Sequence, residues 1–258
     1  ASSTVVIAIP SAFIHQSLHP SLDLLKGKTI FSAVKGMVPE TGQIIGDYLT
    51  EYGAIELKDF GVISGPCHAE EIALERHSYL TVSAVDILKG DQMKDTLSNA
   101  YIRVSTGNDI IGTEYAAVLK NVYAIAAGIA SGLGYGDNFL SVLISHCAKE
   151  LRLFITTIKK DKNRDLNHSA YFGDLLVTTY STFSRNRTFG NMLGKGYSVK
   201  SAMSEMSMIV EGYYAAKNAY EIAKKLNIEC TYINAAYSIL YELANPKKII
   251  KDLADKLY

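Results

Sequence analysis

Cysteine is scarce in this 258-residue sequence. The three cysteines are odd in number and lie far apart, at Cys67, Cys147 and Cys230, in apolar or helical surroundings. This pattern favours reduced thiols in a cytoplasmic protein over a framework of disulfides. Neither a CxxC nor an HExxH motif occurs, so the sequence also lacks the common ligand spacings of zinc sites. We therefore expect a cytoplasmic protein without a metal site.

An excess of charge is also absent, because 26 basic residues balance 26 acidic ones. The charges are scattered, so no general field attracts nucleic acid or an anionic membrane, and an anionic partner must be held locally. No uncharged run approaches the roughly 20 residues of a membrane-spanning helix, and no basic segment precedes an apolar one at the start. We therefore expect no nucleic-acid partner and no stable membrane insertion. The 48% of hydrophobic residues can fill the core of a large globular fold.

The glycine-rich fingerprint Gly-x-Gly-x-x-Gly of dinucleotide-binding folds is missing as well. Even so, the first half alternates β-branched runs with polar helical stretches, which indicates a parallel sheet. The pattern predicts strands at 5–9, 29–34, 61–64, 79–83 and 101–105, and helices at 11–26, 40–52, 67–76 and 90–98. A doubly wound sheet normally begins with a strand, a glycine-rich turn and a helix. Either the sheet binds no dinucleotide by that device, or an N-terminal portion is missing, which the abrupt start inside a strand favours.

After Gly107 the strand pattern stops and helical periodicity continues to the end. The pattern predicts helices at 109–131, 138–160, 168–183, 198–206, 208–226, 231–244 and 246–257. Pro246 stands where a proline fits the first turn of a helix. The chain therefore divides near residue 107 into an α/β part and an all-α part.

A lysine stands inside the apolar, small-residue segment 113–138. Removing an ammonium group from water is costly, so Lys120 either extends to solvent, pairs with a carboxylate or has a lowered pKa suited to chemistry. At about 100° per residue, one arc of the helix carries Lys120, Asn121, Ala117, Ala124, Gly128 and Ser131. Such an arc suits either a ligand that approaches the backbone or tight packing against a neighbouring helix.

The segment 173–187 carries a polar stripe on an otherwise apolar helical pattern. Its members recur at i, i+4, i+7 and i+11, and they are Asp174, Thr178, Ser181 and Arg185. A stripe of this kind faces either a polar partner or solvent. The segment 184–187 then presents guanidinium and amide donors where the helix should end, a combination that suits a phosphate or carboxylate.

Two further groups come directly after predicted strands. Lys35 follows strand 29–34, and the segment 65–71 follows strand 61–64 and should open a helix. Open α/β sheets bind ligands beyond the carboxyl ends of their strands, so both positions face one crevice. A helix that begins at 67–69 supplies N–H groups for an anion or a polar edge of a cofactor. The alternative for Lys35 is an ordinary exposed lysine in a loop. For Cys67 and His68, adjacency in the sequence does not place the imidazole where it could act as a base on the thiol.

Six motifs occur in order along the chain: Ser64-Gly-Pro-Cys-His-Ala-Glu-Glu71, Leu119-Lys-Asn-Val-Tyr-Ala-Ile-Ala-Ala-Gly128, Gly132-Leu-Gly-Tyr-Gly-Asp-Asn138, Gly173-Asp-Leu-Leu-Val-Thr178, Ser184-Arg-Asn-Arg187 and Glu211-Gly-Tyr213. Together they resemble NAD(P)-dependent glycerol-3-phosphate dehydrogenases of the bacterial type. The resemblance implies a partial Rossmann-like parallel sheet at 1–106, the C-terminal portion of an NAD(P)-binding domain. It also implies a helical substrate-binding and catalytic domain at 107–258, similar to the C-terminal domain of 6-phosphogluconate dehydrogenase.

The resemblance also implies roles for single residues. Lys120 matches the family's catalytic base, and Asn121, Asp174 and Thr178 belong to the same catalytic pocket. The positions that match substrate contacts are Lys35, Gly65, Cys67, Lys120, Asp174, Ser184, Arg185 and Asn186. The positions that match cofactor contacts are Lys35, Ala69, Arg185, Ile209 and Glu211. Cys67 stands where the family has a hydroxyl residue, which should weaken one hydrogen bond without removing the site.

The implied reaction interconverts sn-glycerol 3-phosphate and dihydroxyacetone phosphate with NAD(H) or NADP(H), and it supplies glycerol 3-phosphate for phospholipid synthesis. A cytoplasmic homodimer is the implied assembly. The choice between NADH and NADPH depends on a residue near the ribose 2′ position, which belongs to the missing first βαβ unit. Two alternatives stay open: a related β-hydroxyacid or 6-phosphogluconate-type dehydrogenase, and a non-catalytic truncated chain that only dimerises.

Overall fold

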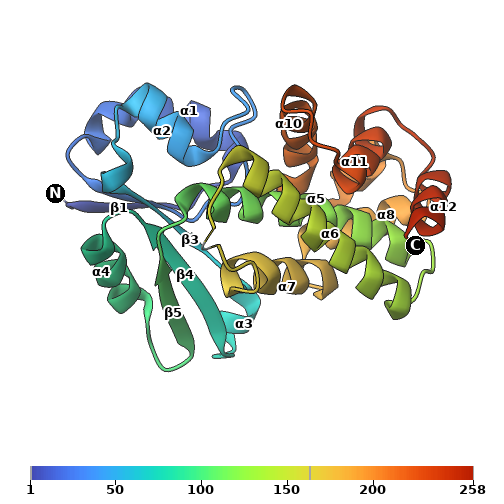
Figure 1. Cartoon of the computed structure of the whole chain (residues 1–258), viewed down its shortest axis with the longest axis horizontal. Helices are drawn as coiled ribbons and strands as arrows, with labels where there is room; N and C mark the ends of the chain where they lie inside the picture. Colours follow the sequence, from blue (N-terminus) through green and yellow to red (C-terminus); the bar gives the residue numbers. More distant parts are fainter. Residues whose placement is uncertain (1, 163, 258) are drawn as a thin grey trace. The chain divides into compact units, whose positions relative to one another are not determined.

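The computed structural model describes residues 2–162 and 164–257 (Figure 1). Its strands are β1 (Thr4–Ile7), β2 (Thr29–Ser32), β3 (Phe60–Ser64), β4 (Ser78–Ala84) and β5 (Ile102–Gly107). Its helices are α1 (Ile14–Leu18), α2 (Ile45–Gly53), α3 (Ala69–Ala73), α4 (Ile87–Leu97), α5 (Ile110–Gly132), α6 (Asp137–Ile158), α7 (Asp174–Tyr180), α8 (Arg185–Gly194), α9 (Val199–Glu205), α10 (Glu211–Lys225), α11 (Thr231–Tyr241) and α12 (Pro246–Lys256). Short 3-10 turns occur at Ser11–Phe13, His19–Leu25 and Leu57–Asp59, and a π-helical turn at Ser169–Gly173.

The chain folds into two compact units. The first consists of Ala1–Ala117 and Lys162–Asp174, and the second of Val118–Asp161 and Leu175–Tyr258. Helix α5 begins in the first unit and continues in the second, and the segment before α7 returns to the first unit. The change from strands to helices still falls near residue 107, as the sequence pattern predicts.

The first unit contains a five-stranded sheet in the order β1-β2-β3-β4-β5. The pairs β1–β2, β2–β3 and β4–β5 are parallel, which confirms the predicted Rossmann-like sheet. The pair β3–β4 is antiparallel, so the expectation of a uniformly parallel sheet needs correction. A parallel crossover needs a helix that packs on the sheet. The five-residue α3, which connects β3 and β4, has no buried residue and provides no such crossover. Helix α4 connects the parallel strands β4 and β5, and its Gly90 and Met93 are buried.

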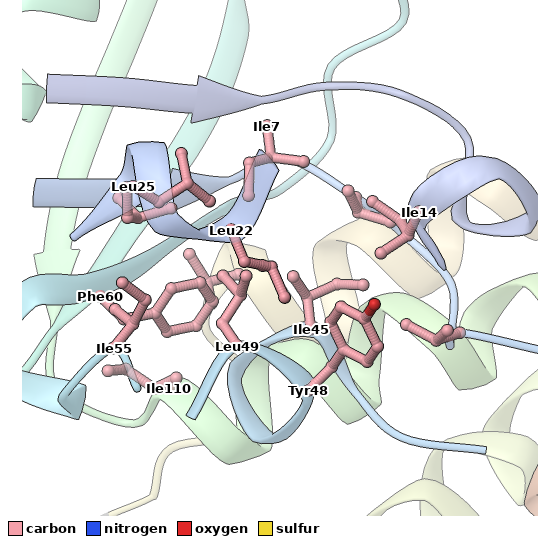
Figure 2. Packing of buried hydrophobic residues seen from close by; sticks show 14 residues of the cluster. Ile7, Ile14, Leu22, Leu25, Ile45, Tyr48, Leu49, Ile55, Phe60 and Ile110 are labelled. Atoms are coloured by element: carbon pink, nitrogen blue, oxygen red, sulfur yellow. The ribbon is translucent and has the colours of Figure 1, made fainter. Parts of the chain in front are cut away.

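Hydrophobic residues pack on both faces of this sheet. Successive side chains of a strand point to opposite faces, and in β3 Val62 belongs to one buried cluster and Ile63 to the other. Figure 2 shows the first cluster, in which residues of α2 approach Leu22 and Phe60. Helix α2 contributes Ile45, Tyr48 and Leu49, whose i, i+3, i+4 spacing gives the helix one apolar face. In the second cluster, residues of the four strands from β2 through β5 pack against residues of α4.

Local capping explains where several helices begin and end. The predicted helix 11–26 is interrupted at Pro20, so α1 ends at Leu18 and a 3-10 turn follows. Helix α2 begins later than predicted, at Ile45, where the Glu114 carboxylate accepts the first backbone N–H groups. Helix α4 begins earlier than predicted because Asp86 accepts from the N–H groups of its first turn.

The second unit is helical, as predicted. Helix α6 buries one face, which consists of Leu140, Leu143, Ile144, Cys147, Leu151, Phe154 and Ile155. Its buried Glu150 accepts hydrogen bonds from Tyr232 N (2.8 Å) and Ile233 N (3.0 Å) and so caps α11. Pro246 occupies the first turn of α12, as the sequence indicates, and Asn245 caps that helix.

The predicted helix 168–183 is wrong in its bounds. A π-helical turn precedes α7, which ends at Tyr180, and a separate helix α8 begins at Arg185. Helix α8 was not predicted because its two glycines, Gly190 and Gly194, and its polar start resemble a connection. No helix among the described residues is long and apolar enough to cross a membrane.

Candidate active site

The carboxyl ends of β1, β2 and β3 lie at one edge of the sheet because these strands are parallel. Lys35 is half-buried and comes three residues after β2, and Gly65 directly follows β3. This is the placement that the strand pattern predicts. Ligands of open α/β sheets bind outside this edge, so both residues stand where a phosphorylated substrate or a dinucleotide can be held.

The turn after β3 binds the Asp174 carboxylate. Asp174 Oδ2 accepts from Ser64 Oγ at 3.2 Å and from Gly65 N at 3.3 Å. Gly65 has a φ of 123°, and a Cβ there would lie 2.5 Å from the Tyr79 carbonyl oxygen, so glycine is required. Asp174 is only 1% exposed. The sequence analysis did not assign Ser64, although this serine lies in the first of the six motifs.

The other two predicted residues of this turn region have different surroundings. Cys67 is half-buried against the second apolar cluster, whereas Ala69 is exposed at the first position of α3. Their segment opens a helix, as predicted, with His68 at the N-cap position. The thiol of Cys67 therefore packs partly against apolar groups, which fits a residue that replaces a hydroxyl without contributing a strong hydrogen bond.

In the second unit, Lys120 and Asn121 are 4% and 5% exposed. Their helix neighbours Leu119 and Val122 are fully buried. The alternative in which the lysine side chain extends to solvent is therefore wrong. A lysine held at such low exposure must interact with partner groups or with a ligand, or have a lowered pKa.

Helix α8 packs directly against the backbone of α5. A Cβ on Gly128 would lie 2.1 Å from the Arg187 carbonyl oxygen, and one on Gly190 would lie 2.1 Å from that of Ile125. The small residues toward the end of the arc thus serve helix packing. The small-residue face of α5 thus has two parts. Its C-terminal part packs against α8, and its N-terminal part carries Lys120 and Asn121.

This packing brings three of the conspicuous motifs together in the second unit. Asn186 Nδ2 donates to Asn121 Oδ1 at 2.9 Å, and Asn186 Oδ1 accepts from Gly212 N at 2.9 Å. The side-chain amide of Asn186, in the first turn of α8, therefore connects Asn121 of α5 to the first turn of α10. Gly212 was not assigned from the sequence, although it lies in the Glu211-Gly-Tyr motif.

The remaining residues of the second unit surround this junction. Ser184 is buried and caps α8, with its Oγ accepting from Arg187 N. Arg185 is exposed, and its Nη1 lies 3.3 Å from Met208 Sδ. The half-buried Ile209 and Glu211 follow that methionine. Predicted cofactor and substrate residues are thus neighbours here.

The predicted polar stripe from Asp174 to Arg185 does not exist on one helix. Asp174 and Thr178 share α7 at i and i+4, and Thr178 is 5% exposed. Arg185 instead begins α8, so the donors of segment 184–187 stand at the start of a helix and not at its end. The positive end of the helix dipole therefore adds to the guanidinium charge. This strengthens the case for an anion there.

The described residues include no group of three or more His, Cys, Asp or Glu side chains that could hold a metal ion. A nicotinamide dinucleotide fits better. The first unit offers the carboxyl edge of three parallel strands, the position at which open α/β sheets bind dinucleotides.

Comparison with known proteins identifies relatives over nearly the whole chain. The family models for the N-terminus and C-terminus of NAD-dependent glycerol-3-phosphate dehydrogenase match residues 1–88 and 109–251. A glycerol-3-phosphate dehydrogenase (NAD(P)+) from Oceanobacillus iheyensis is 34% identical over 253 residues, which cover 98% of this chain and 73% of the relative. The enzyme of the same name from Staphylococcus aureus is 35% identical over 257 residues, with coverages of 97% and 76%.

A solved structure has the same fold. The crystal structure of glycerol-3-phosphate dehydrogenase from Coxiella burnetii matches with a TM-score of 0.92 and 26% sequence identity, covering 98% of this chain and 77% of that one. The motifs that drew attention in the sequence lie within the matched regions. The chain belongs to the NAD-dependent glycerol-3-phosphate dehydrogenase family.

Proposed function

We propose that the protein is an oxidoreductase that interconverts sn-glycerol 3-phosphate and dihydroxyacetone phosphate with NAD(H) or NADP(H). The observation that carries this proposal is the buried Lys120, followed by an asparagine that is tied to α8 and α10 through Asn186. A rigid, buried ammonium or amine group is suited to exchange a proton with a substrate oxygen. Family membership supports the choice of reaction.

Lys120 Nζ is the proton-transfer atom of the proposed reaction. When glycerol 3-phosphate is oxidised, the neutral amine accepts the proton of the C2 hydroxyl while the C2–H bond breaks. In the reverse direction the ammonium group donates that proton to the C2 oxygen and polarises the carbonyl. A bound nicotinamide cofactor would supply the hydride chemistry at C2. Asn121 and Thr178 orient the substrate in the same pocket.

In the second unit, the donors at the start of α8 bind the phosphate group, and in the first unit Lys35 is a further substrate-binding residue of the proposal. Arg185 supplies a planar guanidinium group, and Ser184 and Asn186 flank it. Asp174, at the start of α7, contacts the polar end of the substrate in this proposal. Binding energy from a phosphate remote from C2 holds the reacting carbon in register.

The cofactor contacts of the proposal are Lys35, Ala69, Arg185, Ile209 and Glu211. We assign residues 1–106 to the C-terminal portion of the NAD(P)-binding domain and 107–258 to the substrate-binding and catalytic domain. A cytoplasmic homodimer that supplies glycerol 3-phosphate for phospholipid synthesis completes the proposal. The fold of the relative from Coxiella burnetii supports the division into a sheet part and a helical part.

A substrate panel tests the proposed reaction. We expect oxidation of NADH or NADPH in the presence of dihydroxyacetone phosphate, and a KM at least about 10²-fold higher for phosphate-free dihydroxyacetone, since several charge-assisted contacts to phosphate are lost. Turnover of 6-phosphogluconate or a β-hydroxyacid instead would assign the protein to a related dehydrogenase group. A protein that binds neither NADH nor NADPH in a fluorescence titration would contradict the proposed activity.

A further inference from the structure

A further buried carboxylate, outside the residues discussed so far, stands immediately before α5. Asp109 is 8% exposed, and both of its oxygens accept several hydrogen bonds. Arg164 donates to it twice, from Nε to Oδ2 at 2.6 Å and from Nη2 to Oδ1 at 3.1 Å. The hydroxyl of Tyr171 donates to Oδ2 at 2.7 Å, and Gly112 N donates to Oδ1 at 3.2 Å. All of these groups belong to the first unit.

The close approach of these groups is built into the backbone. A Cβ on Gly112 would lie 1.9 Å from Asp109 Oδ2, so only glycine leaves room for the carboxylate. The side chains of Arg164 and Asp109 are 3% and 9% exposed. Burial raises the pKa of Asp109, but the hydrogen bonds from Arg164 and Tyr171 outweigh this effect and the pKa is lowered overall. Asp109 is therefore ionised, and its bonds to Arg164 and Tyr171 are charge-assisted.

Tyr171 connects this carboxylate to the candidate active site. It lies in the π-helical turn Ser169–Gly173, which runs directly into Asp174, the first residue of α7. Asp174 in turn binds Ser64 Oγ and Gly65 N. The short segment 164–174 is thus fixed to the first unit at both ends, by Asp109 at one end and by the turn after β3 at the other.

We propose that Asp109, Arg164 and Tyr171 are positioning residues that hold the Asp174 carboxylate on the Ser64–Gly65 turn and thereby set the affinity for the substrate. In this proposal, none of the three residues contacts the substrate. They act through the path of the backbone between Tyr171 and Asp174, because a loosened π-helical turn lets the Asp174 side chain leave its two donors. The effect on substrate affinity rests on the proposed function, whereas the effect on the turn does not.

Hydrogen exchange of the Gly65 amide tests the structural half. Tyr171→Phe removes one hydroxyl donor with little change in volume. We expect the Gly65 amide to exchange at least about threefold faster in this variant, because its acceptor is less firmly held. Tyr241→Phe is the matched control, since it removes a hydroxyl that donates to the Tyr213 carbonyl oxygen at 2.7 Å in the second unit. An unchanged exchange rate at Gly65, or an equal change in the control, would refute the positioning role.

Substrate kinetics and calorimetric binding of dihydroxyacetone phosphate test the functional half. We expect Tyr171→Phe to raise KM and Kd by about three- to tenfold while kcat stays within about twofold, the effect of one lost hydrogen bond. In an Asp174→Asn background the same change should add little, because the group through which Tyr171 acts is already altered. Fully additive effects, or an equal KM change in Tyr241→Phe, would overturn the proposal.

A second variant and a separate readout distinguish a folding defect, or a wrong reaction assignment, from a wrong positioning role. If Tyr171→Phe does not fold, Arg164→Lys keeps the positive charge but loses the two-point geometry, and it should give the same KM rise. An unchanged KM in a folded Arg164→Lys protein would overturn the proposal. If the unmutated protein does not bind dihydroxyacetone phosphate at all, the proposed function fails, while the Gly65 exchange experiment still decides whether the three residues position Asp174.

Discussion

At the scale of single residues, the buried Lys120 is the feature on which the proposed chemistry depends. Its sequence context left open whether it reaches solvent, and the structure removes that option with 4% exposure. The neighbouring Asn121 is tied to Asn186, which suits a lysine that must keep one position. Arg185 differs in that it is exposed at the start of α8, where an incoming phosphate can reach it.

The buried Lys120 and the exposed Arg185 should therefore give different kinetic results when each is replaced by alanine. Lys120→Ala should lower kcat by at least about 10²-fold with a modest change in KM, because a proton-transfer group that acts in the transition state is lost. Arg185→Ala should mainly raise KM for dihydroxyacetone phosphate. Steady-state kinetics with saturating cofactor measure both. A near-normal kcat in Lys120→Ala would remove Lys120 from the proposed role.

At the scale of elements, the contact between α5 and α8 shapes the helical half of the candidate site. It depends on glycines that let two helix backbones meet, and it brings Asn186 to Asn121. Glycine inside a helix normally costs stability relative to alanine, by roughly 0.5–1 kcal/mol. Its use at Gly128 and Gly190 therefore indicates that the close approach is worth more than the lost helix propensity.

Gly190→Ala tests this packing. The new Cβ would lie 2.1 Å from the Ile125 carbonyl oxygen, so we expect the free energy of unfolding to fall by about 1–3 kcal/mol although alanine favours the helix. Gly136→Ala is the control, because a Cβ there meets nothing within 4 Å and the φ of −83° suits alanine. Chemical denaturation of both variants gives the comparison. A stabilised Gly190→Ala protein would show that the helices are not in close contact.

At the scale of the whole molecule, each unit contains a buried glutamate that caps a helix. Glu114 accepts from Ile45 N and Gly46 N in the first unit, and Glu150 accepts from the first turn of α11 in the second. Burial raises the pKa of Glu114 to about 8 and that of Glu150 to about 7, despite the opposing backbone hydrogen bonds. Both carboxyl groups therefore bind a proton more strongly in the folded protein than in the unfolded chain.

The sign of the pH dependence follows from these raised pKa values. The contribution of both groups to stability is fully present below their unfolded pKa, near 4.5, and is lost as the pH rises through about 7 and 8. We expect the free energy of unfolding to decrease over this window and the decrease to be smaller in Glu114→Gln/Glu150→Gln. Denaturation between about pH 5 and about pH 8.5 measures it. Glu221→Gln, on the exposed side of α10, serves as control. An equal slope in the double variant would contradict the assignment.

Much of this fold follows from local patterns. The strand runs, the switch to helices near residue 107 and the first turn of α12 depend on residue type and spacing, so the sequence predicts them correctly. Helix α8 escaped prediction because its glycines serve contacts with α5, which are not visible in the sequence of α8. The antiparallel pair β3–β4 escaped because it depends on whether α3 packs against the sheet.

The candidate site divides in the same way. Lys120, Asp174, Arg185 and Asn186 stand out in the sequence, since a charged or amide group in an apolar helix, or donors at a predicted helix end, indicate a candidate site through residue type alone. Their partners do not. Ser64, Gly212 and Tyr171 are ordinary residues in the chain, and they matter because folding brings them within hydrogen-bond distance of Asp174, Asn186 and Asp109. Residue types carry the reactive groups, whereas the geometry that holds those groups depends on contacts between residues far apart in the chain.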